Sequence, residues 1–198
     1  TVPRPPASRE DGYVQLYSDG PYLFVLSVHG AEQTITAYEV DTLRPRWQRT
    51  SPSAAGAFDC GALLCAGTAT GEVDALDPAT GAVRWHAAGW DYARSVGDGT
   101  LLVESHEASR HGLVDEGTGR TLADFGPGFA VLDPVTRTVL SLAPAQSLPP
   151  RLKVQRRTAS GEVVLLGAVS TGGADGCELA AGRLVCAGSG VLTVTDVG

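Results

Sequence analysis

A segment of about forty residues that recurs along the chain restricts its fold more than any other feature of the sequence. The clearest copy, Val73–Trp85, reads as a strand that ends at Asp77, a Pro-Ala-Thr-Gly turn, and a second strand that reaches Trp85. A related copy contains Asp41, a turn two residues shorter, and Trp47, which places the two tryptophans 38 residues apart. Repeats with periods of 20 to 50 residues are typical of solenoids and propellers.

Two further copies follow downstream with weaker signatures. Leu113–Gly119 repeats the strand and the turn 38 residues after the clearest copy, and Ala123 occupies its tryptophan position. Thr158–Leu165 is a fainter copy, in which Leu165 occupies that position. The signature decays along the chain, but its spacing is retained.

A second set of regularly spaced segments supports the repeat. The apolar runs are short, rich in Val, Leu, Tyr and Thr, and bounded by Gly, Pro, Asp and Ser, which indicates strands joined by turns. No segment has the pattern of a long amphipathic helix. The copies are accompanied by five short apolar strands, Leu23–Val28, Leu63–Ala66, Leu101–Val103, Val139–Leu142 and Leu184–Ala187.

The repeat predicts an all-β fold, a β-propeller of about five four-stranded blade repeats, within the range of four to eight blades. A fragment of a seven- or eight-bladed propeller is the alternative. The last copy ends with Val191–Asp196 and lacks its final strand. Because an unpaired strand edge favours aggregation, we expect Tyr13–Tyr17 to supply that strand and close the ring.

The four cysteines fall in two local pairs, Cys60 with Cys65 and Cys177 with Cys186. In the second pair, Ala181–Gly182 would form a hairpin turn that places the cysteines opposite each other. Cys186 lies 121 residues after Cys65, about three repeats, so we expect equivalent hairpins to carry the two bridges. Disulfides persist in oxidising compartments, which predicts an extracytoplasmic location. Four buried free thiols are the alternative.

Composition excludes some classes of partner and indicates a source. The net charge of −7 and the pI near 5.0 disfavour nucleic acid and anionic membrane surfaces. No stretch approaches the roughly 20 apolar residues that cross a bilayer, so we expect no direct membrane insertion. The abundance of Ala, Gly, Val and Arg and the scarcity of Lys, Ile and Asn are typical of a GC-rich bacterial genome.

The two ends of the repeat region define the expected domain organisation. Residues 1–12 are rich in proline and lack apolar periodicity, so they are predicted to be a linker. Residues 13–198 are predicted to form the propeller domain. Because the sequence begins at Thr1 and contains no Met, we expect a mature or trimmed product, secreted or membrane-anchored outside the cell.

Ala75–Trp85 resembles the A-x-D-x-x-T-G-x-x-x-W docking motif of propellers related to the pyrroloquinoline-quinone (PQQ) dehydrogenases. The match is close in this copy and partial in three others. In that family the Trp stacks between neighbouring blades, and the Asp, Thr and Gly shape the turn. The resemblance therefore implies structural rather than catalytic roles for Trp47, Trp85, Asp41, Asp77, Asp115, Thr80, Gly81 and Gly119.

The same family contains both enzymes and non-catalytic members. Its alcohol and sugar dehydrogenases resemble eight-bladed rings. The alcohol dehydrogenases carry a vicinal cysteine pair beside the quinone. In these enzymes an asparagine helps to hold calcium. This chain has no adjacent cysteines and no asparagine. The non-catalytic members of the family include lipoprotein scaffolds for outer-membrane protein assembly and extracytoplasmic sensor domains of kinases.

The resemblance implies a non-catalytic extracytoplasmic scaffold that binds another protein and uses neither PQQ nor another cofactor. A quinoprotein dehydrogenase, and a ligand-sensing domain of a membrane receptor or kinase, are the alternatives. No Gly-x-Ser-x-Gly elbow and no Gly-rich phosphate loop followed by Lys occurs in the sequence.

Two polar segments are candidates for binding. Glu104, His106 and His111 belong to the only local cluster of potential metal ligands, but their spacing fits no standard motif, so a polar surface loop is expected. The basic segment Arg151–Arg157 is the one local positive feature on an acidic chain. We interpret it as a solvated strand face in preference to a partner-facing patch.

Overall fold

A computed structural model describes most of the chain, namely residues 12–30, 32–52, 56–68, 70–106, 108–133, 135–148, 150–157, 162–170, 174–188 and 191–197. Residues 1–11 of the expected linker lie outside the described residues, and so do residues 158–161 in the faint copy. Within them, no helix has the length and apolar composition needed to cross a membrane.

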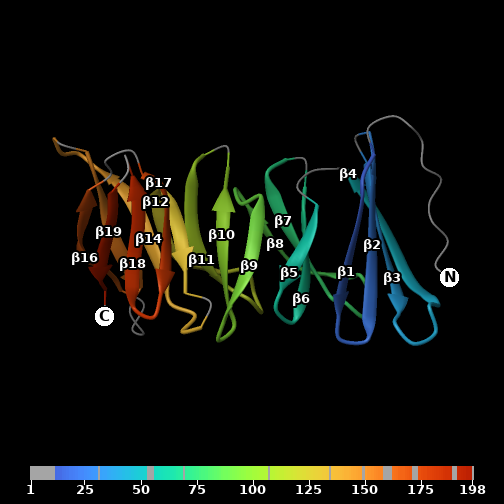
Figure 1. The fold of residues 1–198 in the computed structure, drawn as a ribbon. Coiled ribbons are helices and arrows are strands. Elements are labelled where there is room, and N and C mark those ends of the chain that lie inside the picture. Colours follow the sequence, from blue (N-terminus) through green and yellow to red (C-terminus); the bar gives the residue numbers. More distant parts are fainter. Residues whose placement is uncertain are drawn as a thin grey trace. The chain divides into compact units, whose positions relative to one another are not determined.

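The described chain is all-β, and its strands form five antiparallel sheets, A to E, each built from strands consecutive in sequence (Figure 1). Sheets A and B consist of β1 (Val14–Asp19), β2 (Tyr22–His29), β3 (Glu32–Glu39) and β4 (Pro45–Pro52), and of β5 (Ala57–Cys60), β6 (Leu63–Gly67), β7 (Glu72–Leu76) and β8 (Val83–Ala88).

Sheets C and D also have four strands each, whereas sheet E has three in the described part of the chain. Their strands are β9 (Tyr92–Gly97), β10 (Thr100–Ser105), β11 (Arg110–Asp115) and β12 (Thr121–Pro127); β13 (Phe129–Leu132), β14 (Val139–Ala145), β15 (Arg151–Arg157) and β16 (Val163–Ser170); and β17 (Ala174–Ala180), β18 (Arg183–Gly188) and β19 (Val191–Asp196).

The chain divides into two compact units. The first runs to Ser95 and includes Asp115–Arg120, and the second comprises Val96–Val114 and Thr121–Gly198. The five predicted apolar strands are confirmed as the second strands of the five sheets, β2, β6, β10, β14 and β18. In each unit, buried aliphatic and aromatic side chains on facing sheets form the core.

The prediction for Tyr13–Tyr17 is wrong, because this segment does not pair with β19. Strand β1 pairs with β2 from Val14 opposite Ser27 to Asp19 opposite Tyr22, and is the first strand of sheet A. A two-residue turn at Gly20–Pro21, with Gly20 at φ +52°, joins the two strands. Closing so short a loop costs less chain entropy than pairing with a strand at the opposite end of the sequence.

The two cysteine pairs form disulfides, Cys60 with Cys65 and Cys177 with Cys186. Both bridges join the first two strands of a sheet, as the alignment of the hairpins predicts. Their registers differ, however. Cys177 lies directly opposite Cys186, whereas Cys65 lies opposite Phe58, so the first bridge runs diagonally across its hairpin.

A turn joins the third and fourth strands in each of sheets A, B and C. In sheets B and C, a tryptophan from the preceding sheet packs on this turn. The indole N–H of Trp47, on β4, donates to the carbonyl oxygen of Pro78 at 2.9 Å. The indole N–H of Trp85, on β8, donates to the carbonyl oxygen of Glu116 at 2.6 Å. Each ring also covers the turn glycine, Gly81 or Gly119, so closely that a Cβ there would lie 2.7 Å from it.

These turns share one hydrogen-bond pattern, and it shows that the turn acid predicted for the first copy is the wrong residue. The N–H of Gly81 donates to the carbonyl oxygen of Asp77, and the N–H of Leu43 donates in the same way to Glu39. Glu39, not Asp41, is therefore equivalent to Asp77, and the turn is not shorter. Glu39 lies eight residues before Trp47, as Asp77 lies eight before Trp85.

Acidic side chains hold the turns in shape. Asp77 accepts hydrogen bonds from the backbone N–H groups of Ala79 and Thr80, and its pKa is lowered chiefly by Arg84. Asp115 accepts from the N–H and the hydroxyl of Thr118, which lower its pKa. Since these bonds fix the turn, the following glycine is held at a positive φ beneath the indole.

A histidine and a serine form a buried polar pair in the second unit. His111 on β11 is 1% exposed and Ser141 on β14 is 0% exposed, and a hydrogen bond of 2.9 Å joins Nε2 to Oγ. The imidazole stacks on Phe125 with 5.4 Å between ring centroids. Burial lowers the pKa of His111 from 6.5 to about 4, although the charge of Asp124 acts in the opposite direction.

Replacing Gly119 by Ala is expected to lower the free energy of unfolding by about 2 kcal/mol, from left-handed strain and displacement of the Trp85 indole. Gly71→Ala is the matched control, because Gly71 has a similar φ of +70° but no atom within 4 Å of a new Cβ. Urea denaturation followed by tryptophan fluorescence measures both. Equal losses in the two variants would show that the indole contact contributes nothing.

Acidification is expected to destabilise the fold through His111. The unfolded chain binds a proton near pH 6.5 and the folded chain only near pH 4, so stability falls as the pH decreases between these values, by about 1.4 kcal/mol per pH unit. Unfolding free energies measured across this range should show a shallower slope for His111→Gln. The pKa of His86 is raised, mainly by Asp74, and acts in the opposite direction, so the difference between wild type and variant isolates His111.

Candidate functional site

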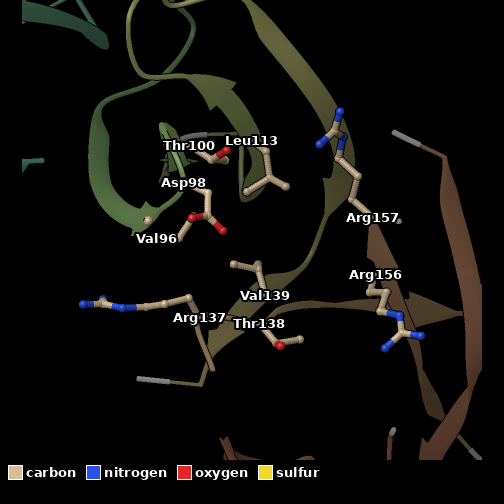
Figure 2. A pocket seen from close by; sticks show the side chains of 10 residues that line it. Val96, Asp98, Thr100, Leu113, Arg137, Thr138, Val139, Arg156 and Arg157 are labelled. Carbon is tan, nitrogen blue, oxygen red and sulfur yellow. The ribbon is translucent and has the colours of Figure 1, made fainter. Parts of the chain in front are cut away.

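A cavity of about 420 Å³ lies in the second unit, where sheet C meets sheet D, and is referred to below as the arginine pocket (Figure 2). Its lining comes from the β9–β10 hairpin, from β11, from the turn before β14, from β14 itself and from the end of β15. The lining residues are Val96, Gly97, Asp98, Thr100, Leu113, Arg137, Thr138, Val139, Arg156 and Arg157.

The β9–β10 hairpin places one acidic side chain at the pocket. The two turn residues, Asp98 and Gly99, have φ values of +50° and +65°. A two-residue turn with both central residues at positive φ matches the right-handed twist of a hairpin, and Asp-Gly is a favoured sequence for it. In Figure 2 the Asp98 carboxylate points into the pocket.

The turn before β14, between the first two strands of sheet D, has an arginine at the position that corresponds to Gly81 and Gly119 in turns of the same hydrogen-bond pattern and to Leu43 in sheet A. The N–H of Arg137 donates to the carbonyl oxygen of Asp133, as the N–H of Gly81 donates to Asp77. Arg137 has a φ of +60°, a conformation that costs an L-residue about 1–2 kcal/mol. A Cβ on Gly97 would lie 3.5 Å from Cγ of Arg137, so the Arg137 stem lies over Gly97.

Asp133 holds this turn. It is 0% exposed, and its carboxylate accepts hydrogen bonds from the N–H groups of Val135 and Thr136 at 2.8 and 3.1 Å. These backbone donors, Thr136 foremost, lower its pKa. The buried acid therefore supports a backbone in which a left-handed arginine is retained at the pocket.

Two more arginines come from the end of β15. Leu152 and Val154 are buried beneath the strand, whereas Arg156 and Arg157 are half-buried and line the pocket. A register shift against β16 falls just before them, between Val154 and Gln155. In the described part of the chain, the guanidinium groups of Arg156 and Arg157, like that of Arg137, form no ion pair.

Figure 2 shows how these side chains are arranged around the cavity. Val139 and Leu113 form apolar walls, and Asp98 points between them. Arg137 and Arg156 contribute their stems and extend their guanidinium groups away from the centre in this view. The arrangement is therefore a cavity of mixed polarity, with apolar walls from Val139 and Leu113 and cationic groups around them.

At this seam the docking tryptophan is absent. Trp47 and Trp85 lie on the fourth strands of sheets A and B, and the equivalent position on β12 is Ala123. Ala123 lies opposite Leu113 and packs in the same cluster as Val139. Two neighbours of Ala123 in this cluster, Leu113 and Val139, line the pocket, whereas Ala123 itself does not.

The turn acid is absent from the faint repeat copy as well. Strand β15 ends at Arg157 as β11 ends at Asp115. Arg157 lies eight residues before Leu165, which is the spacing from Asp115 to Ala123 and from Asp77 to Trp85. The chain therefore carries a cation at the position where three other copies carry a carboxylate, Glu39, Asp77 and Asp115.

The chemistry available in the pocket is that of binding. Guanidinium groups recognise carboxylates and phosphates through paired hydrogen bonds. Two threonine hydroxyls and one carboxylate add donors and acceptors, and the described lining includes no His, Cys or Lys. The buried pair of His111 and Ser141 has the composition of a base and a nucleophile, but neither side chain is exposed to a substrate.

The three metal-ligand candidates surround a different cavity, of about 230 Å³. Glu104 and His106 line it together with His111, whose side chain is buried. Within the residues that the structure describes, no group of three or more His, Cys, Asp or Glu side chains is placed to hold a metal ion. The sequence cluster is thus brought to one cavity without forming a recognisable ligand set.

Sequence reasoning missed the arginine pocket as a site. It singled out Arg156 and Arg157 only as part of a basic strand, and it passed over Arg137. A detectable signal was present, because the segment Asp133–Arg137 reads Asp-Pro-Val-Thr-Arg and matches the Asp-Pro-Ala-Thr-Gly of the clearest copy except at two positions. This match aligns Arg137 with the turn glycine Gly81.

Comparison with known proteins finds no matching family model and no matching curated protein. The structure is similar to BamB from Moraxella catarrhalis, with a TM-score of 0.59, 18% identity, and coverage of 94% of this chain and 63% of that one. It is also similar to the computationally designed protein Ika8, with a TM-score of 0.59, 14% identity, and coverage of 93% and 58%.

A third similar structure is a chain of a mitotic checkpoint complex, with a TM-score of 0.51, 12% identity, and coverage of 95% of this chain and 78% of that one. The present chain spans about three fifths of the length of BamB and of Ika8. At these identities the likeness establishes the fold alone. The all-β prediction is confirmed: the chain has the fold of a β-propeller, with five blade sheets in its described part.

Proposed function

We propose that the chain is a non-catalytic scaffold that binds another protein outside the cytoplasm, with residues 13–198 as its propeller domain and residues 1–12 as a linker. The arginine pocket is the observation that carries the binding role. Its guanidinium groups form no ion pairs among the described residues, and they lie around a cavity with apolar walls from Leu113 and Val139. Charged donors without partners beside apolar walls suit an external ligand that supplies both kinds of contact.

A non-catalytic role is supported by the groups that line this pocket. General acid–base and nucleophilic catalysis need a titratable pair within hydrogen-bond reach of a bound substrate. Asp98 is the one titratable acid in the described lining, and the arginines remain protonated at all physiological pH values. The residues of the docking motif are engaged in packing between sheets and in turn formation.

The two disulfides support an extracytoplasmic location, since such bridges persist in oxidising compartments. One of the similar structures belongs to a mitotic checkpoint complex, so a propeller of related shape takes part in a protein assembly. This likeness supports a scaffold role by analogy of fold. It does not identify the partner.

Cysteine labelling tests the proposed location. Protein taken from its native host by acid quenching, then denatured and treated with a maleimide–polyethylene glycol reagent, is expected to gain no label until a reductant is added, and then to gain four. A parallel sample reduced before quenching controls for access of the reagent. Immediate labelling of all four cysteines would contradict an oxidising compartment.

Titration with PQQ and calcium tests the non-catalytic role. We expect no saturable change in the quinone absorbance and no alcohol-dependent reduction of an electron-accepting dye. A known quinoprotein dehydrogenase, depleted and reloaded under the same conditions, provides the positive control. Saturable PQQ binding coupled to alcohol oxidation would replace the scaffold by the dehydrogenase alternative.

A further inference from the structure

We propose that the arginine pocket binds an acidic segment of the partner protein, with one apolar side chain seated in the cavity and neighbouring carboxylates held by Arg137, Arg156 and Arg157. This proposal rests on the proposed scaffold function and names the chemistry of its partner. It follows from three properties of the seam between sheets C and D: the space left there, the charge around it and the conformation of Arg137.

The space lies at a departure from the repeat. Trp47 and Trp85 occupy the corresponding positions elsewhere, whereas this seam has Ala123, and its cluster neighbours Leu113 and Val139 line the cavity of about 420 Å³. Pockets for compact ligands start at roughly 300 Å³, so the cavity has room for a large apolar side chain and part of its backbone. Val139 and Leu113, which are 9% and 6% exposed, provide its walls.

The side chains around the cavity carry more positive than negative charge. Arg46, Arg49, Arg84 and Arg110 each pair with a carboxylate at 3.1 Å or less. The three pocket arginines form no such pair among the described residues, and Asp98 is the only acid in the lining. A local excess of cations on a chain of net charge −7 favours an acidic ligand at this place and not over the whole surface.

The conformation of Arg137 places a long cationic side chain at the pocket at a cost in backbone strain. In the turns of sheets A, B and C that have the same hydrogen-bond pattern, the corresponding residues are the left-handed Leu43 and the glycines Gly81 and Gly119. Backbone strain of this kind is typically found at functional sites. Arg137 lines the pocket and extends its guanidinium group away from the centre of the pocket (Figure 2).

An acidic peptide segment satisfies all of these groups together. Its carboxylates supply the acceptors that the guanidinium groups lack, and its apolar side chain removes the cavity walls from water. Asp98, which points inward, is placed to accept a hydrogen bond from a backbone N–H of the segment (Figure 2). A free inorganic anion would use the arginines but leave the apolar walls and Asp98 without a role.

Fluorescence anisotropy of labelled synthetic peptides tests the proposal. The probes are dodecapeptides composed of Asp and Glu with one central Leu, Phe or Trp. Two controls match them: peptides with Ser at the centre, and peptides with Asn and Gln in place of the acids. We expect saturable binding of the acidic apolar probes, weakened at least tenfold in either control and weakened by added salt.

Three substitutions are expected to leave the fold intact, because two restore the repeat pattern and one removes backbone strain. Arg157→Asp restores the turn acid, Ala123→Trp restores the indole of the other seams, and Arg137→Gly relieves the left-handed arginine in the turn between β13 and β14. Arg151→Gln is the matched control, because Arg151 is an exposed arginine on the same strand that does not line the pocket. Circular dichroism and thermal melting establish that each variant is folded.

We expect peptide affinity to fall at least tenfold in Arg137→Gly and Arg157→Asp and to change less than twofold in Arg151→Gln. Ala123→Trp, if folded, should lose the preference for an apolar centre while it retains salt-dependent attraction to acidic peptides. Arg137→Gly should melt no lower than the wild type, since it relieves the left-handed arginine.

Several outcomes overturn the proposal. These are the absence of saturable binding for every acidic apolar probe, equal affinity of Arg157→Asp and wild type, and equal competition by free phosphate or succinate, which would indicate a small-anion site. Failure here is distinguishable from failure of the scaffold function. PQQ-dependent alcohol oxidation would refute the scaffold, whereas a pocket that binds no peptide leaves the PQQ and cysteine results unchanged.

Discussion

An indole ring that lies on a left-handed turn holds successive repeats of this chain together. Trp47 and Trp85 each donate one hydrogen bond to a turn carbonyl and cover the glycine that follows it. The contact requires a turn acid to shape the loop, a glycine that tolerates positive φ, and a fourth strand that carries the ring to the right height. The turns of sheets B and C both meet this requirement.

The candidate site lies at the seam between sheets C and D, where this contact is absent. Ala123 removes the ring, Arg157 replaces the acid, and sheet C meets sheet D through a smaller apolar cluster that includes Phe125 and Val139. Buried polar groups, His111 with Ser141, join the same two sheets. Loss of a structural contact and gain of unpaired cations at one seam are easier to understand as a binding specialisation than as decay of the repeat.

Strand identity followed from the sequence because short apolar runs recur at a fixed spacing, and the second strand of every sheet was located in this way. The disulfides followed from cysteine spacing across hairpins. Two features were misread for physical reasons. Tyr13–Tyr17 pairs locally, since a hairpin turn outweighs a distant edge, and Glu39 replaces Asp41 because the backbone pattern, not the identity of the acid, defines the turn. The pocket depends on contacts between repeats, which spacing within one repeat does not reveal.

The consecutive strand order has an evolutionary consequence. Each sheet is a meander of consecutive strands, so its contacts join residues that are close in sequence. Its formation therefore costs little entropy for the closure of long loops. The docking ring lies on the last strand of one sheet and its receiving turn lies in the next. Duplication of the period that contains sheet B would therefore give each new joint the same ring and turn, and one altered period, such as that around Ala123, can diverge in function while its neighbours continue to hold the architecture.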